Sequence, residues 1–131
     1  MFRLEGIDHV ALTVRDVRRS AHWYVEVLGL ERRFADEWGD FPAVVGIGAT
    51  SLALFPVKGS DPRPPPGPDT LCFRHVAFRV DRESFERARE TLTARGIQLE
   101  FQDHGAAHSL YLADPDGHQL EITTYEVPDR R

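Results

Sequence analysis

The sequence predicts an α+β fold of two tandem βαβββ modules, whose mixed sheets form a concave cup with the helices on the outside. Two observations support this prediction. Segments that alternate between apolar and polar residues, typical of strands, lie on either side of a segment with helical spacing, and this order occurs twice. The tripeptide His-Val-Ala also occurs twice, at residues 9–11 and 75–77, each time in the first strand of a module.

The first module is expected to cover residues 4–57. Residues 7–14 alternate between an apolar face and a small or polar face that carries His9. Asp16 is placed to cap the N-terminus of the following helix, and Gly29 to end it. Three strands are predicted after the helix, over residues 31–35, 43–47 and 51–57.

A segment rich in proline and glycine, residues 58–70, is predicted to be a semi-rigid linker, because it suits neither a helix nor a central strand. The second module, residues 71–127, repeats the order of the first, and we expect the two modules to form a single domain. It is expected to begin with a strand over residues 71–80, followed by a helix that is capped by Asp81 or Ser84 and ended by Gly96. Two strands follow, over residues 97–101 and 109–113, and a turn at residues 114–117 leads into the final strand.

Composition and charge exclude several classes of function. The net charge is −5 and no run of lysine or arginine occurs, which argues against nucleic acid or an anionic membrane as a partner. Cys72 is the single cysteine, so neither an intrachain disulfide framework nor a cysteine-based zinc site is expected. No apolar segment approaches the roughly 18 residues of a membrane span, and no signal peptide is recognised. We therefore expect a cytoplasmic protein that acts on a small molecule.

Two histidines and one glutamate are the candidate metal ligands. His9 and His75 are equivalent in the repeat, and the alanine two residues after each leaves room above the imidazole. Glu121 lies between apolar residues of the last strand, where a carboxylate is unfavourable unless it is paired or bound to a metal. Taken singly, each residue is more often structural than a ligand, so the prediction rests on the joint pattern. Two imidazoles and one carboxylate suit a divalent first-row metal and leave coordination positions open.

The repeat also predicts that the site is open. Gly29 and Gly96 are 67 positions apart, and with this offset the counterpart of Glu121 is Leu54. An apolar residue there provides no fourth ligand, so we expect three protein ligands. The residues expected near the substrate are Leu54 itself, Gln119 on the Glu121 face, and Trp38 and Phe41, which would cover the cup as a lid or pack on a partner subunit.

Four segments of the chain together resemble the vicinal oxygen chelate superfamily. They are residues 7–14, 21–30, 74–78 and 111–121, and the resemblance extends from Gly6 to Tyr125. The superfamily includes glyoxalase I, extradiol ring-cleavage dioxygenases, methylmalonyl-CoA epimerase, fosfomycin-resistance thiol transferases and bleomycin-binding proteins. The resemblance implies metal ligands at His9, His75 and Glu121.

The resemblance also separates the reactions. Glyoxalase I and the epimerase have a fourth ligand where this chain has Leu54, bleomycin-binding members generally lack the ligands, and the basic cluster that a phosphonate needs is not found. Residues 104–121 resemble the closing motif of the extradiol dioxygenases, which use Fe(II). This similarity implies that Tyr111 is an active-site tyrosine and that His104 or His108 contacts the substrate as an acid or base.

We therefore expect a metal-dependent enzyme with dioxygenase-like chemistry on a catechol-type substrate, with Fe(II) favoured and Mn, Zn, Ni or Co as other candidate metals. One alternative is a glyoxalase-like lyase or isomerase, or a thiol transferase, that uses a divalent metal. Another is a non-catalytic protein that binds a small molecule. The resemblance also implies a homodimer, with the site formed in one chain or shared across two.

Overall fold

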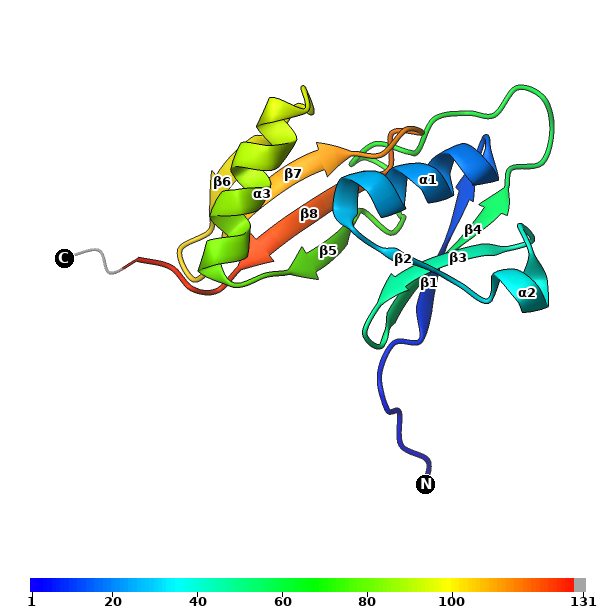
Figure 1. Cartoon of the computed structure of the whole chain (residues 1–131), viewed down its shortest axis with the longest axis horizontal. Helices are drawn as coiled ribbons and strands as arrows, with labels where there is room; N and C mark the ends of the chain where they lie inside the picture. The colour runs from blue at the N-terminus through cyan, green and yellow to red at the C-terminus, as the bar shows by residue number, and fades with distance from the viewer. Residues whose placement is uncertain (129–131) are drawn as a thin grey trace. The chain divides into compact units, whose positions relative to one another are not determined.

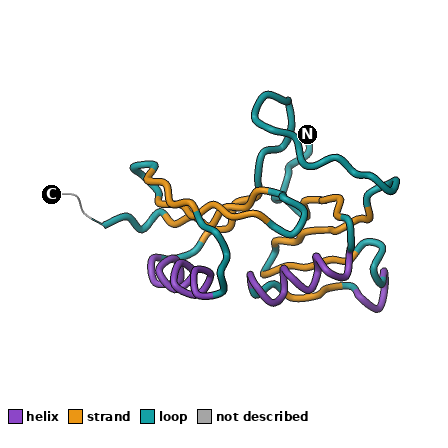
Figure 2. Tube along the Cα trace, turned by 90° about the horizontal axis from the view of Figure 1, so that it is seen from above, coloured by secondary structure: helices purple, strands orange, loops and turns teal. Residues whose placement is uncertain are grey.

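The computed structural model describes residues 1–128, which form two compact units, Met1–Arg63 and the residues from Pro64 onward. The division falls within the proline-rich segment. Each unit holds one four-stranded mixed sheet with a helix along one face (Figures 1 and 2). The α+β class and the repeated βαβββ order are confirmed. Among the described residues, no helix is both long and apolar enough to cross a membrane.

The first unit follows the predicted order with one addition, a short helix between its second and third strands. Asp16 caps α1 by accepting a hydrogen bond from the backbone N–H of Arg19, and Gly29 ends it with a φ of 73°. The strand predicted over residues 31–35 is shorter, because Phe34 has a φ of 57° and is the N-cap residue of the added helix. The elements are β1 (His9–Val14), α1 (Val17–Leu28), β2 (Glu31–Arg33), α2 (Ala35–Trp38), β3 (Ala43–Ile47) and β4 (Thr50–Pro56), with the sheet order β1-β4-β3-β2.

The two faces of the first sheet differ in what covers them. One face packs on α1, where the side chains of Tyr24, Val45 and Leu54 are fully buried. The other face, here called the open face, carries His9 and Ala11, which are exposed, because exposed residues of β1 alternate with less exposed ones. Burial of the apolar face therefore fixes which way His9 points.

Gly46 of β3 provides a test of the packing on the open face. A Cβ atom at this position would lie 2.5 Å from the carbonyl oxygen of Thr50 and 2.8 Å from Nη1 of Arg33. We expect Gly46→Ala to lower the free energy of unfolding by about 1–3 kcal/mol through overpacking. Gly67→Ala is the control, because its nearest neighbour would be Asp69 Oδ1 at 3.5 Å. Equal denaturation midpoints for the two variants would contradict this account.

The second unit repeats the architecture without the extra helix. Asp81, and not Ser84, caps α3, because its carboxylate accepts a hydrogen bond from the backbone N–H of Ser84. The predicted strand over residues 71–80 is reduced to the four residues that pair with β8, so residues 71–75 lie outside the sheet. The elements are β5 (Val76–Arg79), α3 (Arg82–Ala94), β6 (Glu100–Asp103), β7 (His108–Ala113) and β8 (Gln119–Thr124), with the sheet order β5-β8-β7-β6.

The turn between β7 and β8 sets the register of the site. The carboxylate of Asp114 accepts hydrogen bonds from the backbone N–H groups of Asp116 and His118, and Gly117 has a φ of 88°. These contacts confirm the turn predicted at residues 114–117. They place Tyr111 directly opposite Glu121 in the antiparallel pair.

The strand registers correct the prediction for Leu54. Ala11 pairs with Ala53 in the first unit, and Ala77 pairs with Glu121 in the second. The counterpart of Glu121 is therefore Ala53, because the offset between the units grows along the chain and a single offset of 67 does not hold in the last strand. Leu54 lies on the opposite face of the sheet, fully buried in the core under α1. Ala53 also has no ligand atom, so the expectation of three protein ligands is unchanged.

Candidate active site

The centre of the candidate site is a contact between His75 and Glu121. His75 immediately precedes β5, and Glu121 lies in β8, the strand that pairs with β5. His75 Nε2 is 2.8 Å from Glu121 Oε1, and the Ser109 hydroxyl donates a hydrogen bond of 2.6 Å to Glu121 Oε2. The glutamate is 8% exposed, so both oxygens of a buried carboxylate have partners. Glu121 can therefore lie between apolar residues in the sequence, because it is buried together with the polar partners of its carboxylate.

Tyr111 extends this cluster. Its hydroxyl is 3.0 Å from Nε2 of His104, in the loop before β7, and its ring meets the His75 ring edge to face at 5.8 Å. Burial raises the pKa of Tyr111 above its ordinary value of 10.0, and the negative charge and hydrogen bond of Glu121 act in the same direction. Ser109 and the positive charge of Arg74 oppose this shift. Tyr111 is therefore a neutral phenol near neutral pH.

This electrostatic arrangement predicts how Tyr111 titrates in metal-free protein. Glu121→Gln removes the negative charge while keeping the shape of the side chain, so we expect the pKa of Tyr111 to fall toward its ordinary value. The titration of the Tyr111 ring, followed by NMR of tyrosine-labelled protein, measures the change. Tyr125 is the internal control. A Tyr111 pKa that is unchanged in the variant would contradict the assigned role of Glu121.

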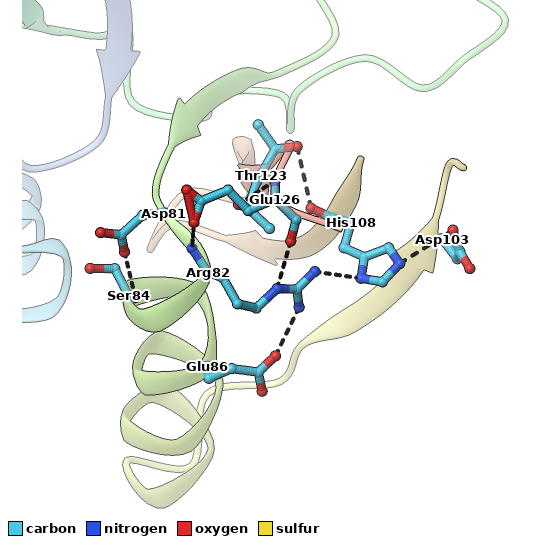
Figure 3. Close-up of polar contacts among 9 residues, drawn as sticks. Asp81, Arg82, Ser84, Glu86, Asp103, His108, Thr123 and Glu126 are labelled. Atoms are coloured by element: carbon cyan, nitrogen blue, oxygen red, sulfur yellow. Dashed lines mark hydrogen bonds and ion pairs between the residues drawn. The ribbon is translucent and has the colours of Figure 1, made fainter. Parts of the chain in front are cut away.

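His108, the other histidine considered for the site, lies on the opposite face of β7. Arg82 of α3 donates a hydrogen bond of 2.8 Å to His108 Nδ1, and His108 Nε2 is 3.4 Å from Asp103 Oδ1 (Figure 3). Its ring also lies beside that of Phe85 in the helix-covered core. Strand alternation places His108 and Tyr111 on opposite faces of β7, and of the two histidines His104 is the one that contacts Tyr111.

His9 belongs to the first unit and has its own carboxylate partner. His9 Nδ1 is 2.8 Å from Asp8 Oδ2, and the histidine side chain is half exposed. Histidines that bind metals usually donate one ring N–H to a carboxylate, which fixes the ring and leaves the other nitrogen for the metal. The Asp8 contact gives His9 this arrangement with Nε2 available. Sequence reasoning missed Asp8, although a carboxylate adjacent to a candidate ligand is a readable signal.

The His75–Glu121 pair fits two ligands of a divalent metal in chemistry and in spacing. Ligand atoms about 2.1 Å from a metal in neighbouring octahedral positions are about 3 Å apart, close to the separation of His75 Nε2 and Glu121 Oε1. Across residues 1–128, however, no group of three His, Cys, Asp or Glu side chains is arranged to hold a metal. The structure thus brings together two of the predicted ligands, and the third lies in the other unit.

The predicted pocket residues lie in three different environments. Trp38 of α2 is 51% exposed, and its ring packs against that of Phe34, the N-cap residue of the same helix. Phe41 is 68% exposed and meets Phe55 of β4 edge to face. Gln119 is exposed at the start of β8 and, by alternation, lies on the Glu121 face. The exposed rings of Trp38 and Phe41 therefore lie in the first unit, and the exposed amide of Gln119 lies on the Glu121 face in the second.

Comparisons with known proteins identify the family of the chain. Residues 6–122 match the Glyoxalase/Bleomycin resistance protein/Dioxygenase superfamily. The chain is 30% identical over 119 residues to glutathione transferase FosA of Serratia marcescens, covering 91% of this chain and 80% of that protein. It is 26% identical over 130 residues to metallothiol transferase FosB of Staphylococcus epidermidis, covering 97% and 87%.

A solved structure gives the same result. The crystal structure of a glyoxalase/dioxygenase from Nostoc punctiforme superposes with a TM-score of 0.74 at 28% identity, covering 95% of this chain and 92% of that one. The match therefore extends over nearly the whole of both chains. This chain belongs to the Glyoxalase/Bleomycin resistance protein/Dioxygenase superfamily.

Proposed function

We propose that the protein is a metal-dependent enzyme that acts on a small substrate through two neighbouring oxygen atoms, with dioxygenase-like chemistry on a catechol-type compound. His75, Glu121 and His9 would hold the metal, with Fe(II) favoured and Mn, Zn, Ni or Co as alternatives. When bound, the metal would act as a Lewis acid toward the substrate oxygens and, as Fe(II), supply electrons for reaction with O₂. The observation that carries the proposal is the contact of Tyr111 with His104, beside the His75–Glu121 pair.

The residues of the second unit can handle the substrate protons. A catechol must lose protons before both oxygens can chelate, and Tyr111 lies opposite Glu121 with its hydroxyl 3.0 Å from His104 Nε2. His104 can therefore accept a proton that passes through the Tyr111 hydroxyl, and return it later in the reaction. The raised pKa of Tyr111 favours its neutral form, which can donate a hydrogen bond to a negatively charged substrate oxygen. Ser109 holds Glu121 Oε2, so Oε1 is the oxygen directed at His75.

Oxygen consumption tests this reaction. The protein is loaded anaerobically with Fe(II), and oxygen uptake is followed after addition of catechol and substituted catechols. We expect uptake that depends on iron and is absent from Glu121→Ala protein. No uptake with any diphenol would rule out the dioxygenase reaction.

The second candidate is thiol transfer, because curated relatives named glutathione transferase FosA and metallothiol transferase FosB match nearly the whole chain. The same metal site would then activate a small oxyanion-bearing electrophile. Loss of glutathione in the presence of fosfomycin and Mn(II), without oxygen uptake, would favour this reaction over the first. A non-catalytic binding function would be favoured if the purified protein bound no divalent metal.

We also propose that the protein works as a homodimer, in which His9 is supplied either by the same chain or by a second copy. Mixed dimers of His9→Ala and Glu121→Ala chains separate the two arrangements. Activity in the mixture, with neither variant active alone, indicates ligands shared between copies. An inactive mixture that still contains mixed dimers indicates that each site is formed within one chain.

A further inference from the structure

Arg33 places a positive charge on the open face of the first sheet. It lies in β2, where its register partner is Val44 of β3, yet its side chain reaches across β3 to β4. Nη1 of Arg33 is 3.3 Å from the hydroxyl oxygen of Ser51 and 3.4 Å from the carbonyl oxygen of Thr50. The guanidinium therefore lies at β4, two strands away from the backbone of Arg33 in β2.

Gly46 makes this crossing possible. A Cβ atom on Gly46 would lie 2.8 Å from Nη1 of Arg33 and 2.9 Å from the Ser51 hydroxyl oxygen, so any other residue would obstruct the arginine. Glycine weakens a strand interior and often marks a place where another group passes close to the backbone. The glycine in β3 thus leaves free the space that the Arg33 side chain and the Thr50 carbonyl oxygen occupy.

The crossing brings the guanidinium to the neighbourhood of His9. Ser51 is the register partner of His9 in the parallel pair β1–β4, so the two side chains lie on the same face of adjacent strands. Arg33 is held on the His9 face by a neutral hydroxyl and a neutral carbonyl. The neighbouring residue Arg32 lies on the other face, where it contacts the Asp40 carboxylate at 3.4 Å and the carbonyl oxygen of Gly39.

Arg33 therefore differs from Arg32, because no carboxylate of the described residues pairs with its positive charge. Within residues 1–128 it makes no ion pair, and Glu31, which shares its face by alternation, lies beyond ion-pair distance. A guanidinium has five N–H donors in a planar fork that matches a carboxylate or another oxyanion. The two contacts in the structure use only one of its nitrogens, so other donors remain for a ligand.

The same face also offers apolar surface. Ala11 is a small, exposed residue of β1, whereas its register partner Ala53 is buried; the exposed ring of Phe41 packs edge to face on Phe55 of β4. An aromatic ring can rest on the exposed side chains of Ala11 and Phe41. Cationic and aromatic groups on one face fit a ligand that combines a ring with a negative charge.

We propose that Arg33 binds an oxyanion of the substrate, so that the preferred substrate is an aromatic acid and not a neutral catechol. The inference rests on the proposed function only in placing the substrate on the His9 face. For a catechol-type reaction it assigns a dihydroxybenzoate as the substrate class. Arg33 is then the residue that determines specificity, and Ser51 is a positioning residue that holds it.

The test compares 3,4-dihydroxybenzoate with catechol, which lacks only the carboxylate. Binding of each to the metal-loaded full-length protein is measured by calorimetry without oxygen. Wild-type protein is expected to bind the acid about 10- to 100-fold more tightly, the usual effect of a hydrogen bond between charged groups. Arg33→Gln should remove this preference without changing the affinity for catechol, and Arg33→Lys should keep part of it. Arg32→Gln, on the opposite face, should leave both affinities unchanged.

The inference is overturned if wild-type protein shows no preference, if Arg33→Gln retains the preference, or if Arg32→Gln loses it equally. Thermal melting of both glutamine variants shows whether a loss reflects unfolding, and retention of the preference by Arg33→Lys supports the role of charge. Oxygen uptake separates this inference from the proposed reaction. A preference for the acid that depends on Arg33, without oxygen uptake, supports the binding site and contradicts the dioxygenase reaction. Equal oxygen uptake with both compounds, in wild type and in Arg33→Gln, supports the dioxygenase reaction and contradicts the binding site.

Discussion

Replacing Tyr111 with phenylalanine is expected to lower kcat/KM by about 100- to 10,000-fold, the usual contribution of a positioned acid or base. The variant keeps the ring that meets His75 edge to face but loses the hydroxyl that contacts His104. Metal binding should be unaffected, because no predicted ligand is removed. Steady-state kinetics of metal-loaded protein, together with its metal content, measures both effects.

Two further variants sharpen this prediction. Tyr125→Phe is the matched control, because Tyr125 is exposed beyond the end of β8 and packs under the Arg79 guanidinium. It should retain wild-type kinetics. His104→Gln should reduce the rate less than Tyr111→Phe, because the phenol remains but its proton acceptor is weaker. A Tyr111→Phe enzyme as fast as Tyr125→Phe would show that the phenol takes no part in the reaction.

Phe85→Ala is expected to lower the free energy of unfolding by about 3–5 kcal/mol. Phe85 is fully buried on α3, and its ring contacts those of Phe101 and His108 on the strands below. Removing the ring leaves a cavity between helix and sheet that the rigid strands cannot close. Denaturant unfolding measures the loss, with Phe73→Ala as the control, because the side chain of Phe73 is fully exposed. A loss below about 1 kcal/mol would contradict the packing described here.

Much of the fold is predictable from the sequence because its signals are local. Asp16 and Gly29 mark the two ends of α1 in the sequence and in the structure, and the turn at residues 114–117 places Tyr111 opposite Glu121. The conformation of Phe34 is not predictable from such local signals. An aromatic residue with a left-handed backbone conformation is uncommon, so the early end of β2 and the presence of α2 leave no sequence signal.

The site was only partly predictable because it depends on register and on long side chains. A single offset between the repeats selected Leu54, whereas strand pairing shows that Ala53 is the counterpart of Glu121. The sequence also left His104 and His108 as equal candidates, and only their placement on the loop and on the helix-facing side of β7 separates them. Arg33 reaches across a strand through the space at Gly46, an arrangement that periodicity does not reveal.

The central claim is that His9, His75 and Glu121 hold one divalent metal, and metal binding at equilibrium tests it most directly. Wild-type protein and the variants His9→Ala, His75→Ala and Glu121→Ala are dialysed against Fe(II) or Mn(II), and bound metal is measured by mass spectrometry. We expect about one ion per chain in wild type and an affinity more than about 100-fold lower in each variant. His22→Ala, an exposed histidine of α1, should bind like wild type. A wild-type protein without bound metal, or full binding by the three ligand variants, would contradict the account.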